Sequence, residues 1–120
     1  MDAKQIVFFK KLLLAERERV LNNSKKTLES DLHVSADDLP DETDIAAHES
    51  NQHLTFQLRD RERQLLSEIN EALMRLDEGS YGVCEETEEP IETERLKAVP
   101  WTRLSLAGAE IRENRRKKFA

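Results

Sequence analysis

Two long amphipathic runs, separated by a break that ends in a proline, constrain the fold of this chain more than any other feature. The chain has 120 residues but only three glycines and three prolines, so little interrupts helix formation. A helix of about 30 residues reaches about 45 Å, and two such helices joined by a short connection form an antiparallel hairpin. The sequence therefore predicts a rod-shaped helical hairpin.

The first predicted helix runs from about Ala3 to about Ser30. Apolar residues recur on one of its faces at Ile6, Phe9, Leu13 and Val20, and Leu12 and Leu14 widen that face. Beyond Val20 the face becomes polar. Pro40 disfavours helical geometry in the residue before it, so we expect a loop from residue 31 to residue 40.

The second predicted helix begins at or just after Asp41 and ends near Asp77. Its apolar positions follow the helical period of 3.6 residues: Leu54, Leu58, Leu65, Ile69, Ala72 and Leu76. The segment from residue 44 to residue 53 has almost no apolar face. Because both helices lose their apolar face toward the connection, we expect that end of the hairpin to protrude into water.

The last third of the chain predicts a small lobe. Gly79 offers a left-handed cap for the second helix, and the residues around Tyr81 and Ile91 predict a short β-hairpin. Its expected core comprises Tyr81, Val83, Ile91, Leu96, Ala98, Trp101, Leu104 and Leu106. A final helix should run from about Ser105 to Lys118. We thus divide the chain into a helical hairpin at residues 1–78, with its tip at about 32–46, and a lobe at residues 79–120.

Charge and composition exclude several classes of protein. The net charge of -6 argues against a protein that coats nucleic acid, and no nucleophile–base pair, metal cluster or phosphate-binding glycine loop indicates an enzyme. The single cysteine, Cys84, excludes an internal disulfide and fits a reducing compartment. Lys10 and Lys11 split the apolar run near the start, so we expect neither a secretory nor a membrane segment. These features favour a cytoplasmic protein.

The charges are also segregated along the chain. Residues 41–53 hold four acidic and no basic residues, whereas residues 99–120 hold six basic and two acidic residues. Such a separation can steer docking onto a large charged partner, although solvated surface is the ordinary reading of a single charge run.

Three short motifs point to a family. They read D-E-T-D-I-A at residues 41–46, R-D-R-E-R at residues 59–63, and Y-G-V-C at residues 81–84, followed by R-L-K-A-V-P at residues 95–100. In combination they resemble the DksA/TraR family of bacterial RNA polymerase regulators, from about Phe9 to the carboxyl terminus. The resemblance implies a mainly α fold: a long antiparallel coiled-coil hairpin, a small degenerate zinc-finger-like lobe and a C-terminal helix.

The resemblance also assigns residues to a function. In the family the hairpin enters the secondary channel of RNA polymerase, which would bring Asp41 and Asp44 near the active site to modulate promoter complexes. Ala46 matches the small residue of the family's tip, and Arg61 best matches a contact with the channel rim. The competing interpretation of the two aspartates is helix capping, since carboxylates at a helix start bond free amides and favour the dipole.

Most members of the family hold a structural zinc ion with four cysteines. The matching positions here are Cys84, Thr87, Ser105 and Gly108, which offer one thiolate where four ligands are needed. We therefore expect a zinc-independent member without a cofactor. For Cys84 itself, a redox role and inert packing both remain open.

Larger members bind the alarmone ppGpp, a signal of the stringent response, through basic residues at the junction of hairpin and lobe. The matching positions here are Glu68, Val99 and Ala109, so we expect weak or absent dependence on ppGpp at this site. The expected partner is RNA polymerase, bound by a monomer without membrane association or sequence-specific nucleic-acid binding. The alternatives are a helical-hairpin adaptor without polymerase activity and a DNA-binding zinc-finger-like module.

Overall fold

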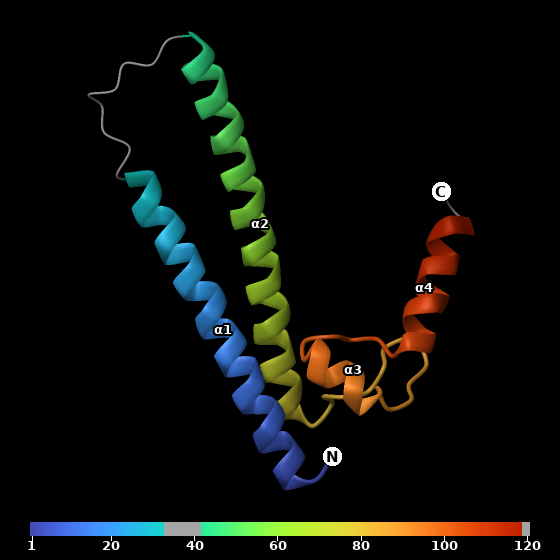
Figure 1. The fold of residues 1–120 in the computed structure, drawn as a ribbon. Coiled ribbons are helices and arrows are strands. Elements are labelled where there is room, and N and C mark those ends of the chain that lie inside the picture. Colours follow the sequence, from blue (N-terminus) through green and yellow to red (C-terminus); the bar gives the residue numbers. More distant parts are fainter. Residues whose placement is uncertain (33–41, 119–120) are drawn as a thin grey trace. The chain divides into compact units, whose positions relative to one another are not determined.

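The computed structural model describes the backbone of residues 1–32 and 42–118 and the side chains of residues 1–26 and 45–118. Within these ranges the chain forms four helices: α1 (Ala3–Leu32), α2 (Glu42–Glu78), α3 (Thr93–Ala98) and α4 (Leu106–Lys118) (Figure 1). The predicted mainly α fold and both long helices are confirmed. The expected loop at residues 31–40 falls largely outside the described residues.

The helices begin and end at residues that suit these positions. The Asp2 carboxylate accepts the Gln5 N–H at 2.9 Å and Gln5 Oε1 accepts the Asp2 N–H at 3.3 Å, a reciprocal cap that starts α1. Ser105 Oγ accepts the Gly108 N–H at 3.1 Å and caps α4 in the same way. Gly79, at φ 83°, ends α2 in the left-handed conformation that its sequence position predicts.

The chain divides into two compact units, which are described separately. One, the core unit, comprises residues 1–16 and 68–120; the other, the hairpin unit, comprises residues 17–67. In the core unit the first half of α1 runs antiparallel to the last turns of α2 (Figure 1). Its buried apolar residues are Phe9, Leu13, Ile69, Ala72, Leu76, Tyr81, Cys84, Ile91 and Leu96. The predicted apolar faces are therefore confirmed at these positions, whereas Ile6 and Leu14 of the first face are 36% and 37% exposed and lie outside the core.

The lobe of the core unit contains less regular structure than its sequence predicts. Among the described residues there is no strand, only one antiparallel bridge between Val83 and Pro90. Buried Tyr81 anchors the lobe by donating its hydroxyl to the Pro100 carbonyl at 2.7 Å, while its ring lies 5.6 Å from that of Phe9. The short helix α3 was not predicted, because six residues are too few to reveal a helical period.

Three residues assigned to the core of the lobe lie outside it. Val83 is 46% exposed and Leu106 is 58% exposed, and Ala98 also faces solvent. Cys84, the neighbour of Val83, points inward instead, because successive side chains of an extended segment point to opposite sides. Of the remaining predicted core residues, Trp101 and Leu104 are half-buried.

In the hairpin unit, α2 turns a different face toward the interior than its apolar stripe predicts. Leu54 and Leu58 are 57% and 55% exposed, so their assignment to the buried stripe was wrong. The half-buried positions of α2 in this unit are Thr55, Arg59, Glu62, Leu65 and Leu66, so the stripe is kept at Leu65 and lost toward Leu54. Among the described α1 side chains of this unit, Val20 is the one buried apolar residue, and the half-buried Ser24 beside it is polar.

Candidate functional site

The predicted acidic tip lies at the edge of the described structure. Asp41 lies outside the described residues, and Asp44 belongs to the first turn of α2 but its side chain lies outside them as well. Ala46 is exposed on α2, and so is Arg61. The fifteen residues between Ala46 and Arg61 correspond to about 22 Å along a helix and a net rotation of about 60°, which places both on the same side of α2.

Arg61 stands on a partly apolar surface that the sequence did not predict. At helical spacing, Leu54 and Leu58 share its side of α2, and both are exposed. Its neighbours in the arginine motif differ from one another: Arg63 is exposed, whereas Arg59 is half-buried and interacts with other groups. The arrangement of one cation beside two leucines suits a protein partner that presents both apolar and acidic side chains.

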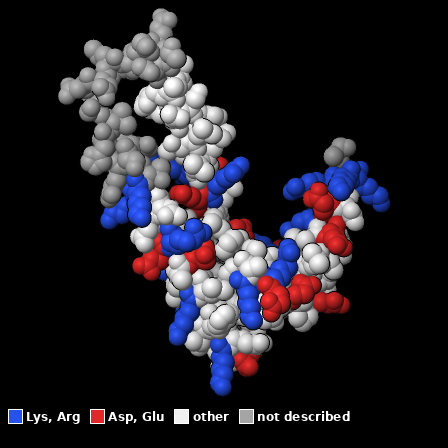
Figure 2. Space-filling model, viewed as in Figure 1, with Lys and Arg blue, Asp and Glu red and all other residues white. Residues whose placement is uncertain are grey.

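The described side chains of the hairpin unit carry a net positive charge, although the sequence of the whole unit, residues 17–67, is acidic. Its described side chains include seven basic and four acidic residues, although the whole chain carries a net charge of -6. The positive charges do not extend along all of α2, since residues 45–58 contain a single charged residue, Glu49. That part of α2 is drawn as an uncharged surface in Figure 2.

The two helices of the hairpin unit meet through a polar contact. Ser24 of α1 donates its hydroxyl to the carboxylate of Glu62 on α2. Val20 lies one turn before Ser24 on the same face of α1 and is 2% exposed. The buried Val20 and the hydrogen bond from Ser24 to Glu62 thus lie next to each other on the inner face of α1.

Glu68, one of the three positions at which ppGpp binding was considered from the sequence, is engaged in an ion-pair cluster. The Arg103 guanidinium donates to the Glu68 carboxylate at 3.0 Å and also pairs with Glu71 and, at 3.3 Å, with Glu85. Arg103 therefore lies among three carboxylates, which neutralise its charge toward any further anion. The other two matching positions, Val99 and Ala109, are half-buried and uncharged.

The four positions that match zinc ligands do converge in space. Cys84 is 1% exposed, and the side-chain and backbone groups of Ser105 and Thr87 hydrogen-bond its sulfur. Burial raises the pKa of Cys84, but these hydrogen bonds outweigh it and lower the pKa from 9.0 to about 6. Gly108 completes the group, and the space that a β-carbon there would need is occupied by the Cys84 sulfur.

This group of residues does not fit a structural zinc ion. Zinc of that kind takes four thiolate or imidazole ligands, and the converging positions supply one thiol, two hydroxyls and a glycine without a side chain. Within residues 1–26 and 45–118, no group of three or more His, Cys, Asp or Glu is arranged to hold a metal ion. We call Cys84, Thr87, Ser105 and Gly108 the thiol cluster below.

No helix in the described part of the chain has both the length and the apolar character that crossing a bilayer requires. The described residues thus define a helical-hairpin protein with a small lobe that hydrogen bonds and apolar packing hold together. Its exposed residues offer surfaces for binding a partner.

Comparison with known proteins places the chain in a family. Residues 5–76 match the family model of the DnaK suppressor protein DksA, N-terminal domain, and residues 79–114 match that of the prokaryotic dksA/traR C4-type zinc finger. The chain belongs to the DksA family. It matches the zinc-finger model although Cys84 is its single cysteine.

Relatives of known name match over nearly the whole chain. The chain is 41% identical over 115 residues to the RNA polymerase-binding transcription factor DksA of Caulobacter vibrioides, which covers 96% of this chain and 80% of the relative. The protein of the same name from Haemophilus influenzae is 32% identical over 120 residues, covering 100% and 82%. The solved structure of transcription factor DksA2 from Pseudomonas aeruginosa superposes with a TM-score of 0.85 at 36% identity, covering 97% and 88%.

Proposed function

We propose that this chain regulates transcription by binding RNA polymerase directly, and that the tip of its hairpin enters the secondary channel. The names of its relatives support polymerase binding, and the match covers most of both chains. The length of α2 supports channel entry, since 37 helical residues extend over about 55 Å. Asp41 and Asp44 then act near the active site, where carboxylates alter the charges around bound magnesium.

The surface formed by Leu54, Leu58 and Arg61 is the proposed contact with the channel rim. Exposed leucines on a helix gain free energy when a partner covers them, and the arginine selects a partner with carboxylates at its edge. Ala46 lets the tip approach closely because its side chain is small. The polymerase supplies the catalytic activity, and the chain itself acts as a binding protein without a cofactor.

A helical-hairpin adaptor is the second candidate function. The observation that favours it is the exposure of Ile45, Leu54, Phe56 and Leu58, each at least 46% exposed, which gives α2 an exposed apolar surface on two of its sides. Such a surface suits another helical protein as well as it suits a polymerase. The two candidates differ in whether the acidic tip matters.

Three further properties belong to the proposal. The donor set of the thiol cluster supports folding without zinc, and the pairing of Glu68 with Arg103 supports weak or absent ppGpp dependence at the family site. The chain has a single cysteine, Cys84, which is buried and cannot form an internal disulfide. This fits a monomer in the cytoplasm.

The deciding experiment is transcription in vitro from a ribosomal RNA promoter with purified RNA polymerase. Wild-type chain is compared with Asp44→Asn and with a matched control, Glu49→Gln, which removes a carboxylate from the same helix. We expect all three to bind polymerase equally, and only Asp44→Asn to lose the effect on transcription. Equal activity of the two variants would remove Asp44 from the mechanism, and absence of polymerase binding by the wild type would favour the adaptor.

A further inference from the structure

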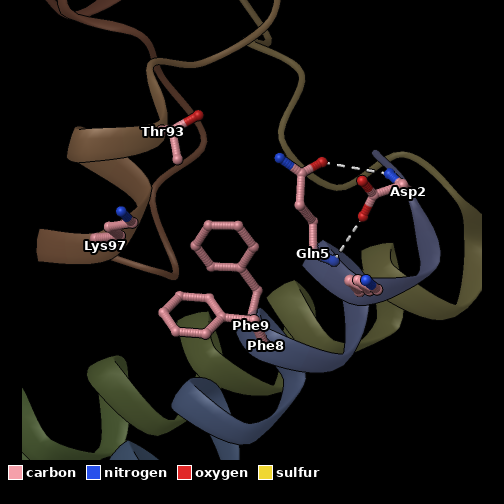
Figure 3. A pocket seen from close by; sticks show the side chains of 7 residues that line it. Asp2, Gln5, Phe8, Phe9, Thr93 and Lys97 are labelled. Carbon is pink, nitrogen blue, oxygen red and sulfur yellow. Dashed lines mark hydrogen bonds between the residues drawn. The ribbon is translucent and has the colours of Figure 1, made fainter.

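A cleft with a volume of about 350 Å³ lies in the core unit, between the start of α1 and the helix α3 (Figure 3). Small-molecule sites in proteins have volumes of about 300–1,000 Å³, so the cleft lies at the small end of that range. Its walls come from the first turns of α1 and from one face of α3. Neither the hairpin unit nor the thiol cluster contributes to it, so the functions proposed above leave it unused.

Two adjacent phenylalanines form the apolar wall of the cleft. Phe9 is 1% exposed and belongs to the core, whereas Phe8 is 49% exposed. Their ring centroids are 5.1 Å apart at an interplanar angle of 81°, so the buried ring holds the exposed one edge-on. An aromatic ring fixed in this way presents a face on which another ring can stack.

Hydrogen-bond donors face the rings from both helices. Gln5 Oε1 accepts the Asp2 N–H, which turns the amide nitrogen of Gln5 away from Asp2 and toward Thr93 across the cleft (Figure 3). Thr93 adds a hydroxyl and Lys97 an ammonium group from α3. Lys4 supplies a second cation from α1.

The negative charges at the cleft are already engaged. The Asp2 carboxylate accepts the Gln5 N–H and belongs to the cap of α1. Glu94 pairs with Lys97 at 3.6 Å, but the two side chains are 89% and 50% exposed. An ion pair this exposed is weak and exchanges readily for a better anion. The lining therefore favours a ligand that carries negative charge.

We propose that this cleft binds a small anion that bears an aromatic ring. The ring stacks on Phe8, and the anionic group accepts hydrogen bonds from Lys97 and from the amide of Gln5, with Lys4 adding electrostatic attraction. Aryl carboxylates and nucleotides share this chemistry. The cleft and its ligand do not depend on polymerase binding, so this proposal can be tested independently of the proposed function.

Titration of the ¹⁵N-labelled full-length chain tests the proposal, with 1-naphthoate and adenosine 5′-monophosphate as separate probes. We expect saturable amide shifts at Gln5, Phe8, Thr93 and Lys97 with at least one probe. Saturation by naphthoate alone assigns the site to aryl carboxylates, and saturation by the nucleotide alone assigns it to nucleotides. The neutral analogue 1-naphthylmethanol should bind about tenfold more weakly than naphthoate, because it lacks the charge.

Matched variants locate the site. Phe8→Ala and Lys97→Gln should each weaken binding of the bound probe by about tenfold. The controls are Phe56→Ala, which removes an exposed ring from the hairpin unit, and Lys117→Gln on α4; both should bind as the wild type does. Thermal melts confirm that each variant is folded. The proposal is overturned if neither probe gives saturable shifts, or if Phe8→Ala and Lys97→Gln bind as tightly as the controls.

Discussion

A β-carbon on residue 108 would overlap the sulfur of Cys84, so Gly108 and Cys84 share one space inside the lobe. The sulfur also accepts hydrogen bonds from Ser105 and Thr87, and Ser105 at the same time caps α4. The thiol cluster thus connects the loop after α2 to the first turn of α4. This connection is made where zinc-bearing relatives would place a metal ion.

The first prediction concerns the shared space. Gly108→Ala should destabilise the chain by about 1–3 kcal/mol, because the added methyl group overpacks the cluster. In a Cys84→Ala background the same change should be neutral or stabilising, since alanine favours a helix over glycine by about 0.5–1 kcal/mol. Urea unfolding of the four chains of this cycle measures the coupling. Similar costs of Gly108→Ala in both backgrounds would contradict the packing relationship.

The second prediction concerns pH. Although burial raises the pKa of Cys84, hydrogen bonds from Ser105 and Thr87 lower it from its ordinary value of 9.0 to about 6 in the folded chain. Between these values the unfolded chain therefore binds the additional proton. Stability should therefore rise from pH 6 to pH 9, by at most about 1.4 kcal/mol per pH unit, and fall as the pH drops through 6. The measurement is the difference in unfolding free energy between wild type and Cys84→Ala. A difference independent of pH would mean that the folded chain keeps the thiol protonated.

The third prediction compares two aliphatic residues of the same predicted stripe, one buried and one exposed. Ile69→Ala should cost about 2–5 kcal/mol because Ile69 is fully buried, whereas Leu58→Ala should change stability by no more than about 0.5 kcal/mol. Leu58→Ala should instead weaken binding to RNA polymerase. Denaturation and a polymerase pull-down measure the two effects. Strong destabilisation by Leu58→Ala would show that Leu58 is packed in solution.

The fourth prediction concerns the metal. Exhaustive chelation should leave the far-UV circular dichroism, the melting temperature and the transcriptional effect unchanged, because the thiol cluster lacks a ligand set for structural zinc. A zinc-bearing relative treated in parallel serves as the control and should lose structure. Loss of structure or activity in this chain would refute zinc independence.

The fifth prediction concerns the ion-pair cluster. Arg103→Gln leaves Glu68, Glu71 and Glu85 without their shared cation, so it should destabilise the core unit by about 1 kcal/mol after allowance for solvent screening. Arg116→Gln, on the exposed end of α4, should have no measurable effect. The loss should shrink at high salt. Equal stability of the two variants would show that the cluster contributes nothing.

The sequence predicted burial more accurately at one end of the hairpin than at the other. For Phe9, Leu13, Ile69 and Leu76 the helical period predicted burial correctly, because both helices offer apolar faces there. For Leu54 and Leu58 the same period failed. A pattern in one helix shows which face is apolar, but burial also requires a partner surface, which the pattern does not report.

The cleft beside Phe8 and the pairing of Glu68 with Arg103 were not predicted at all. Both join residues from distant parts of the chain, and no local pattern relates Gln5 to Thr93 or residue 68 to residue 103. The unpredicted helix α3 forms one wall of the cleft. Only the adjacent Phe8 and Phe9, a pair that a single helix face cannot bury, hinted at an additional surface; Phe8 is the exposed member.

The sequence by itself determined the lengths of the two long helices, the cap at Gly79 and the presence of a single cysteine, because these follow from period, backbone preference and residue identity at single positions. Only the tertiary structure decided which face of α2 meets α1, and that Cys84, Thr87, Ser105 and Gly108 converge as a hydrogen-bonded cluster. Those outcomes depend on what the rest of the chain presents to each side chain, and burial is a property of both surfaces in a contact.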